Sequence, residues 1–158
     1  MKKLWAPWRM KYILHMKSKK CFLCRSTREK NQDIKNYVFL RGSSCFVILN
    51  TFPYNNGHLM VAPYRHVGEI ENLREEEMKE LMNLSARAIK ILKKALKPDG
   101  FNVGFNLGKV SGAGLASHLH LHIVPRWQGD TNFMPVLGDT KVISQFLKDT
   151  YRKLRKFL

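Results

Sequence analysis

The sequence predicts an α+β domain, in which one antiparallel sheet of about five strands carries a long helix and a C-terminal helix. Three observations support this prediction. Short apolar segments alternate with turn residues on both sides of residues 78–96, which repeat apolar residues at helical spacing. A second helical repeat, rich in Lys and Arg, covers residues 141–158. Strands that follow one another through short turns favour antiparallel pairing.

The first three strands are predicted over residues 37–41, 45–50 and 58–63. All three are rich in apolar residues. The segment Gly42-Ser43-Ser44 suits a hairpin turn between the first two strands. Residues 51–57 contain a proline, two asparagines and a glycine, a composition typical of loops.

The long helix is predicted to begin after Asn72 as its N-cap, with acidic residues in the first turn and lysines in the last. Residues 101–107 alternate apolar and polar residues, which predicts a strand with one buried face. That strand could lie next to the strand at 58–63. The buried stripe of the helix is predicted to contain Met78, Leu81, Met82, Ser85, Ala88, Ile89, Leu92 and Leu96.

Three histidines alternate with apolar residues in the segment His118-Leu119-His120-Leu121-His122. If this segment is a strand, all three imidazoles share one face. Chance alternation on a half-exposed strand is the alternative, but histidine is uncommon and this chain has six. The outer two would lie about 13 Å apart, too far for one zinc ion to bind all three. At least one ring is therefore free for nucleophilic or acid–base chemistry.

The composition indicates one globular domain with a strong positive charge. The chain has 158 residues, with 28 Lys and Arg against 12 Asp and Glu, and a net charge of +16. Such a field attracts nucleic acid, nucleotides and polyphosphates, although a generally basic surface is an equal alternative. No apolar run approaches the roughly 20 residues that span a bilayer, and the basic N-terminus lacks the apolar stretch of a signal sequence. We expect a cytoplasmic protein that does not bind membranes.

The cysteines do not suggest a disulfide framework, because there are three of them. Cys45 lies in an apolar segment and is expected to be a buried, inert thiol. Cys21 and Cys24 form a C-x-x-C pair in a basic segment that we expect to be a loop. Such a pair is half of a zinc site or a redox pair, and redox pairs usually precede a helix, so this context favours zinc.

A glycine-rich loop directly precedes the histidines. Residues 108–114 contain three glycines, which allow backbone amides to approach an anion closely. In a basic protein, this arrangement suggests a phosphate held beside an imidazole. A neutral histidine can attack phosphorus while its other ring N–H is held by an acceptor, which gives a phosphoramidate intermediate. The competing interpretation is a nucleotide- or nucleic-acid-binding module that uses the basic C-terminal helix.

The segment His118–Val124 matches the pattern His-φ-His-φ-His-φ-φ, where φ is apolar, and so resembles the histidine triad (HIT) superfamily of nucleotide hydrolases and transferases. Residues 50–63 and 105–108 also resemble that family, in the same order. The resemblance implies a HIT-like fold. Its core would lie at about residues 20–127.

The flanks are similar to the bacterial diadenosine tetraphosphate phosphorylase branch of the superfamily. They extend the resemblance to nearly the whole chain, which implies a single domain of residues 1–158 with terminal extensions packed on the core. The segments that carry this similarity are 4–9, 53–61, 101–104 and 124–133.

The resemblance implies a role for each matching residue. His120 would attack the α-phosphorus and carry the nucleotidyl group, while His122 and His58 would bind or orient phosphate oxygens. The contacts to ribose and phosphates would come from Asn50, Asn106, Gly112, Ala113, Gly114 and Leu115.

In members of the superfamily that have a C-x-x-C pair, the resemblance also implies a bound zinc ion. Here its ligands would be Cys21, Cys24, His66 and His118. This is a tetrahedral set of the closed, structural kind. The alternative for His66 is an ordinary exposed loop histidine. No organic cofactor is implied.

One departure from the family pattern bears on the reaction. Many hydrolytic members have glutamine four residues before the first triad histidine, where this chain has Gly114. A glycine leaves room for an acceptor larger than water, such as inorganic phosphate. This is consistent with what the resemblance of the flanks implies, namely phosphorolysis of diadenosine tetraphosphate to ADP and ATP through a nucleotidyl-histidine. The alternative is a HIT-type hydrolase of dinucleoside polyphosphates or nucleoside phosphoramidates, and the resemblance implies a homodimer or larger assembly.

Overall fold

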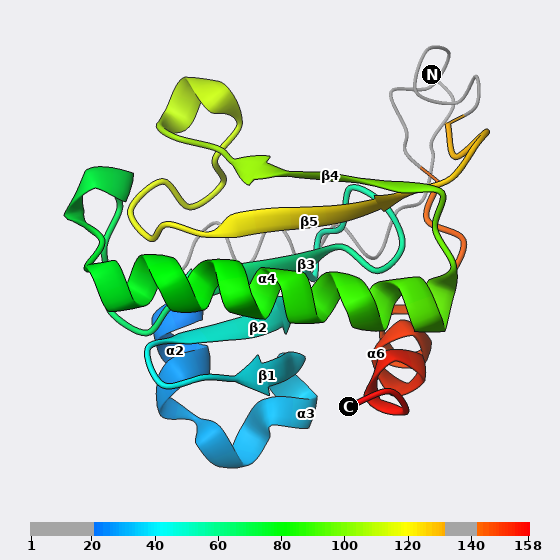
Figure 1. The fold of residues 1–158 in the computed structure, drawn as a ribbon, viewed down its shortest axis with the longest axis horizontal. Coiled ribbons are helices and arrows are strands. Elements are labelled where there is room, and N and C mark those ends of the chain that lie inside the picture. Colours follow the sequence, from blue (N-terminus) through cyan, green and yellow to red (C-terminus); the bar gives the residue numbers. More distant parts are fainter. Residues whose placement is uncertain (1–20, 132–141) are drawn as a thin grey trace, which may run out of the picture.

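The computed structural model describes residues 21–131 and 142–158. Five strands form one antiparallel sheet in the order β1-β2-β3-β5-β4, which confirms the predicted α+β architecture (Figure 1). The strands are β1 (Val38–Arg41), β2 (Cys45–Leu49), β3 (Leu59–Pro63), β4 (Gly100–Phe105) and β5 (Leu121–Arg126). The helices are α2 (Phe22–Arg28), α3 (Asp33–Asn36), α4 (Glu75–Leu96) and α6 (Leu147–Arg155), with short 3-10 turns at Lys30–Gln32, Ile70–Asn72 and Lys109–Ser111.

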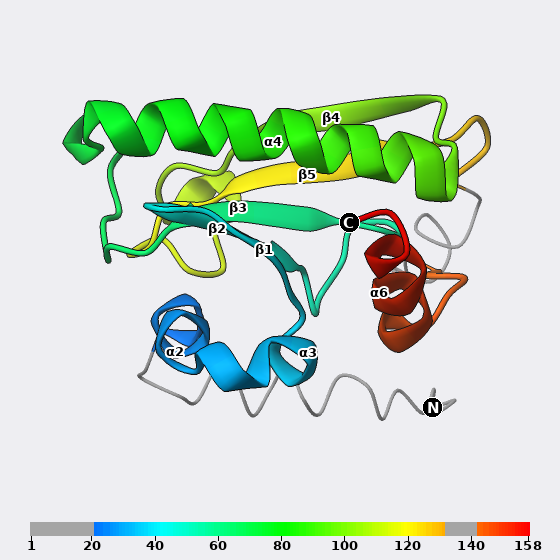
Figure 2. The same ribbon diagram turned by 60° about the horizontal axis from the view of Figure 1, so that its bottom comes forward.

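The sheet has helices on both faces. Helix α4 crosses one face, and α2 and α3 lie on the opposite side (Figure 2). Side chains of Val47, Leu49 and Val61 belong to the core shared with α4, whereas Phe46 and Met60 pack with Leu23 of α2. Each strand alternates its side chains between the two faces, and both faces of β2 and β3 are buried, so these strands are apolar throughout. No helix in these two described ranges is long and apolar enough to cross a bilayer.

The strand order differs from one sequence expectation. Strand β5 pairs with both β3 and β4, so β3 and β4 are not neighbours. The central position buries Leu121 and Ile123 of β5 completely or nearly so, which an edge position would not do. Strand β4 is one of the two edge strands, and its predicted buried face is incomplete, since Val103 is 46% exposed.

Several predicted element boundaries also differ. The C-x-x-C segment is the start of helix α2 rather than a loop, because Cys21 is the N-cap and its sulfur accepts the Cys24 N–H at 3.4 Å. The histidine segment becomes a strand only at Leu121, and α6 begins at Leu147 rather than at residue 141. Segment 4–9, which carries part of the family resemblance, lies outside the described residues.

Helix α4 begins later and is rotated relative to the prediction. Asn72 lies in a 3-10 turn, and the N-cap is Arg74, whose backbone N–H donates to the Glu77 carboxylate at 2.9 Å. Met78 and Met82 are 47% and 58% exposed. Their places in the core are taken by other residues of the helix, Leu84, Ile91 and Ala95.

Glu80 ties α4 to the β1–β2 turn. Its carboxylate accepts the backbone N–H groups of Ser43 and Cys45, both at 2.7 Å, and that of Ser44. It also accepts the Ser44 hydroxyl at 2.7 Å. Burial alone would raise the pKa of Glu80, but these hydrogen bonds outweigh it and hold the pKa below its ordinary value.

We expect Glu80→Ala to destabilise the protein by about 2 kcal/mol, because it leaves several turn N–H groups without their acceptor. The matched control is Glu76→Ala, since Glu76 is exposed and lies in a weak 3.9 Å ion pair with Arg74. That variant should change stability by no more than about 0.5 kcal/mol. Urea unfolding measures both values, and equal effects would contradict the anchoring role of Glu80.

Candidate functional site

Three buried histidines meet on the sheet face opposite α4. His122 lies on β5 opposite Met60 of β3, and so shares the face of Met60. His58 directly precedes β3, and His120 directly precedes β5. The ring centroids of His58 and His122 are 5.1 Å apart, and those of His120 and His122 are 4.7 Å apart.

Hydrogen bonds determine which nitrogen of His58 and His122 carries a proton. The Tyr54 backbone N–H donates to His58 Nδ1 at 3.0 Å, so the proton of neutral His58 is on Nε2. His58 Nε2 lies 2.9 Å from His122 Nδ1 and therefore donates to it. Neutral His122 then carries its own proton on Nε2. This buried N–H has no hydrogen-bond partner among residues 21–131 and 142–158.

His120 has the opposite tautomer. Its Nδ1 lies 2.8 Å from the backbone carbonyl oxygen of His118, which can only accept, so Nδ1 carries the proton. The lone pair of His120 is consequently on Nε2. His120 and His122 are each only 7% exposed. The site thus presents one imidazole lone pair and one imidazole N–H on adjacent rings.

Burial keeps these rings neutral. Burial, with a smaller contribution from the neighbouring imidazoles, lowers the pKa of His58 to about 3 and that of His122 to about 4. Burial also lowers the pKa of His120, against a hydrogen bond to the His118 carbonyl that favours the charged form. At neutral pH the tautomers derived from the hydrogen bonds are therefore the ones present.

Asn50 and His58 use their polar atoms within the protein. The Asn50 side-chain oxygen accepts the Phe52 N–H at 2.9 Å, and its nitrogen lies 3.3 Å from His58 Nδ1. Asn50 is 9% exposed and His58 is fully buried. This geometry favours a role in orienting His122 over the direct substrate contacts expected from the sequence.

Tyr54 is a site residue that the sequence reasoning missed. Its ring lies over His58 and His122, with centroids 4.7 and 5.5 Å away, and is 49% exposed. Its hydroxyl accepts the Asn106 amide N–H at 3.3 Å. The available signal was its position in the loop four residues before His58.

The predicted phosphate loop is exposed and glycine-dependent. Gly108 and Gly112 adopt φ angles of 78° and 88°, which favour glycine. Gly112 and Gly114 are exposed, and Ala113 and Leu115 are partly buried. A Cβ at Gly114 would meet nothing within 4 Å, so the space expected there is present.

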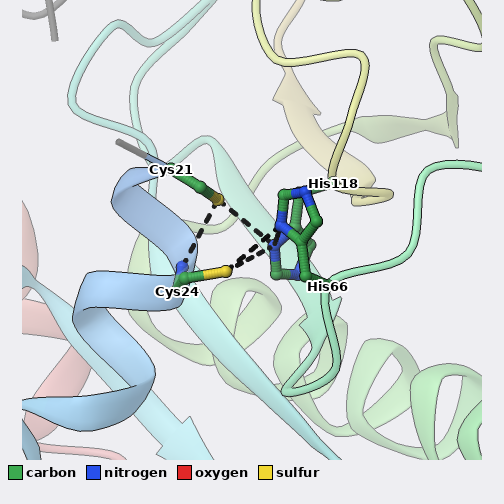
Figure 3. Close-up of side chains that lie close together, drawn as sticks. All are labelled: Cys21, Cys24, His66 and His118. Carbon is green, nitrogen blue, oxygen red and sulfur yellow. Dashed lines mark hydrogen bonds between the residues drawn. The ribbon is translucent and has the colours of Figure 1, made fainter. Parts of the chain in front are cut away.

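The four predicted metal ligands lie together beside this site (Figure 3). His118 Nδ1 is 3.3 Å from Cys21 Sγ and 3.2 Å from His66 Nδ1, and Cys24 Sγ is 3.2 Å from His66 Nδ1. All four ligand atoms lie within 4.8 Å of one another. Tetrahedral zinc with bonds of ~2.1–2.3 Å separates ligand atoms by roughly 3.4–3.8 Å, so the set fits such an ion.

His118 is oriented for this cluster and not for the row of histidines. Its Nε2 lies 2.9 Å from the Pro63 carbonyl oxygen and donates to it, which leaves the Nδ1 lone pair directed at the cluster. Burial and the adjacent Cys21 together raise the pKa of Cys24 to about 11. A thiolate at this position therefore needs a cation beside it. His118 therefore faces the cluster, whereas the rings of His120 and His122 contact each other. The three rings do not form one row because regular strand structure begins only after His120.

Comparison with known proteins agrees with this arrangement. A family model described as "HIT domain" matches residues 31–129. The chain is 44% identical over 161 residues to "AP-4-A phosphorylase" of Mycobacterium tuberculosis, an alignment that covers 98% of this chain and 83% of the relative.

Two solved structures share the fold. A hypothetical histidine triad nucleotide-binding protein of Sulfolobus tokodaii superposes with a TM-score of 0.67 and 27% identity, covering 87% of this chain and 88% of that one. A Zn-bound histidine triad family protein of Mycobacterium smegmatis has a TM-score of 0.69 and 23% identity, covering 87% and 91%. The motif, the fold and the near full-length similarity lead to one conclusion: the chain belongs to the HIT family and is an enzyme of that family.

Proposed function

We propose that this enzyme transfers a nucleotidyl group from a dinucleoside polyphosphate to inorganic phosphate, converting diadenosine tetraphosphate to ADP and ATP. The observation that carries the proposal is the tautomer of His120. The carbonyl of His118 holds the Nδ1 proton, so Nε2 of a neutral, buried ring is available as a nucleophile. The 44% identity with the mycobacterial phosphorylase supports the choice of substrate and acceptor.

The reaction then takes two balanced steps. His120 Nε2 attacks the α-phosphorus, and the bond from that phosphorus to the bridging oxygen breaks, so ATP departs with the electron pair. The adenylylated ring is cationic and keeps its Nδ1 proton on the His118 carbonyl. An oxygen of inorganic phosphate attacks the same phosphorus, and the N–P bond breaks. ADP leaves, and His120 returns to the neutral tautomer without any proton having left Nδ1.

The neighbouring rings supply a fixed donor. His122 Nε2–H is buried without a partner in the described ranges, and a phosphate oxygen at the reacting phosphorus would give it an acceptor. His58 and Asn50 act behind it as positioning residues, because the N–H of His58 determines that His122 donates from Nε2. The backbone amides of Gly112–Leu115 and the Asn106 side chain are the proposed contacts to the other phosphates.

The proposed metal is a structural zinc ion bound by Cys21, Cys24, His66 and His118. It would supply a closed tetrahedral link between α2 and the chain entering β5, and no chemistry at phosphorus. We extend the proposal to one domain of residues 1–158 that acts as a homodimer or larger assembly.

Product analysis tests the proposed reaction. Incubation with diadenosine tetraphosphate should give ADP and ATP in equal amounts, and only when inorganic phosphate is present. AMP and ATP formed without phosphate would identify a hydrolase and contradict phosphorolysis.

His120→Ala should lower turnover by at least ~10³-fold, because the nucleophile is lost. Titration of this variant with diadenosine tetraphosphate should still reach saturation of binding. His120→Ala with unchanged turnover would contradict the covalent mechanism.

Metal content tests the zinc proposal. Protein expressed in metal-replete medium should contain close to one zinc ion per chain, and Cys24→Ser should contain several-fold less. Removal of zinc by a chelator should lower thermal stability, because the ion links separate segments. Cys45→Ser is the matched control: Cys45 is buried but lies outside the cluster, so the variant should retain its zinc. Wild-type protein without zinc would contradict the four-ligand site.

Histidine titration tests the neutral pair. Because the pKa of His58 is lowered to about 3 and that of His122 to about 4, both rings should stay neutral as pH falls. NMR signals of their ring carbons should keep the chemical shift of neutral imidazole down to about pH 5, whereas ordinary histidines titrate near 6.5. As pH falls below about 6.5, the two histidines take up protons in the unfolded chain before they do so in the folded protein. Their contribution to the free energy of unfolding is therefore present above about pH 6.5 and is lost as pH falls through their pKa values in the folded protein. Titration of His58 near pH 6.5 would contradict the arrangement.

A further inference from the structure

A pocket next to Tyr54 has no role in the chemistry described so far. Its volume is about 340 Å³, and it is lined by Tyr54, Asn55, Asn102, Val124, Arg126 and Thr131. This volume lies within the range of small-molecule sites, about 300–1,000 Å³. The pocket is separate from the metal cluster, which shares no residue with it.

The pocket adjoins the reaction centre, since Tyr54 contacts His122 and Val124 lies two residues from His122 on strand β5. His122, Val124 and Arg126 alternate along this strand, so their side chains share one face. On the neighbouring strand β4, Gly104 pairs with His122 and Asn102 pairs with Val124. Gly104 has no side chain, and a Cβ there would meet nothing within 4 Å, so the surface beside His122 is open toward the pocket.

The lining suits a nucleoside. Tyr54 offers a half-exposed aromatic ring that already lies over His122, and Val124 offers an apolar surface. The guanidinium of Arg126 is held by two hydrogen bonds to Asp130, at 2.6 and 2.9 Å, and by one of 2.7 Å to the side-chain oxygen of Asn102. An ordered guanidinium plane and an aromatic ring both stack on bases.

Asn102 adds a polar group without a competing partner. Its side-chain oxygen accepts from Arg126, which orients the amide, and its Nδ2 donates to no group in the described part of the chain. Asn102 is exposed at the rim of the pocket, and an oriented amide donor there matches the ring nitrogens and hydroxyls of a nucleoside. Arg126 is neutralised by Asp130, so the pocket is less suited to another phosphate.

We propose that this pocket binds the nucleoside of the departing half of the substrate. The inference rests on the proposed function. The transferred nucleoside is joined directly to the phosphorus beside His120, whereas three phosphates separate that phosphorus from the far ribose of diadenosine tetraphosphate. Val124 lies about 7 Å along β5 from His122, a distance that the longer tether spans. Tyr54 therefore belongs to both the reaction centre and the pocket. Its ring covers His58 and His122 and also forms one wall of the pocket.

The test compares two ligands that differ in the second adenosine. His120→Ala protein is titrated with diadenosine tetraphosphate and with adenosine 5′-tetraphosphate by calorimetry, so that turnover does not interfere. Stacking of one base should make the dinucleotide bind about tenfold more tightly. Adding Asn102→Ala, or Asn102→Trp to fill the pocket, should reduce this ratio to about twofold or less. Asn83→Ala, at an exposed position on α4 across the sheet, is the matched control and should preserve the ratio.

Equal binding of the two ligands by His120→Ala protein would overturn the inference. A tenfold ratio that persists with Asn102→Trp, in protein whose melting temperature is unchanged, would overturn it as well. Turnover by the wild-type protein is a separate measurement. Its absence with diadenosine tetraphosphate contradicts the proposed function, whereas normal turnover together with an unchanged ratio contradicts only the pocket.

Discussion

One residue, His118, connects the cluster of four predicted metal ligands with the candidate reaction centre. Its Nε2–H donates to the Pro63 carbonyl, and its Nδ1 faces Cys21, Cys24 and His66. Its backbone carbonyl accepts the Nδ1 proton of His120. The position of that carbonyl decides which His120 nitrogen keeps its lone pair, and so which nitrogen would be the proposed nucleophile. The segment lies outside regular strand structure, so cross-strand bonds do not hold it, apart from the bond of 2.6 Å from the Leu119 N–H to the Val67 carbonyl. A structural ion on His118 would therefore stabilise the tautomer of a ring two residues away.

A second series of hydrogen bonds fixes the tautomer of His122. It starts at a backbone N–H in the loop before β3, passes through His58, and ends at the N–H of His122. Neutral His58 and neutral His122 each have only one tautomer that makes both of these hydrogen bonds possible. The Tyr54 backbone N–H therefore determines that His122 carries its proton on Nε2. The loop geometry at Tyr54 is thus as important to the site as the histidines themselves.

The sequence was most informative where local periodicity and residue type carry the signal. A long helix over α4 and a strand in the histidine segment were predicted from such patterns, although both elements begin later than predicted. The place of β5 between β3 and β4 was not, because strand order depends on pairing between distant segments. Met78 and Met82 satisfied the helical period, but the helix turns a neighbouring stripe to the sheet. Tyr54 was missed because a loop residue carries no periodic signal, and its role appears only when the loop is folded over His122.

Burying three imidazoles costs hydration free energy, and the structure shows how most of that cost is offset. The Nδ1 of His120 and both nitrogens of His58 have partners within the protein, and burial favours the neutral forms that these bonds require. The exception within the described ranges is His122 Nε2–H, a buried donor with nothing to donate to. Such a group costs about 1–3 kcal/mol while it is unpaired. A phosphate oxygen placed there would recover that free energy, so the unpaired donor favours the bound state over the free one. If the oxygen gains negative charge as the His120–phosphorus bond forms, the same N–H stabilises the transition state more than the substrate.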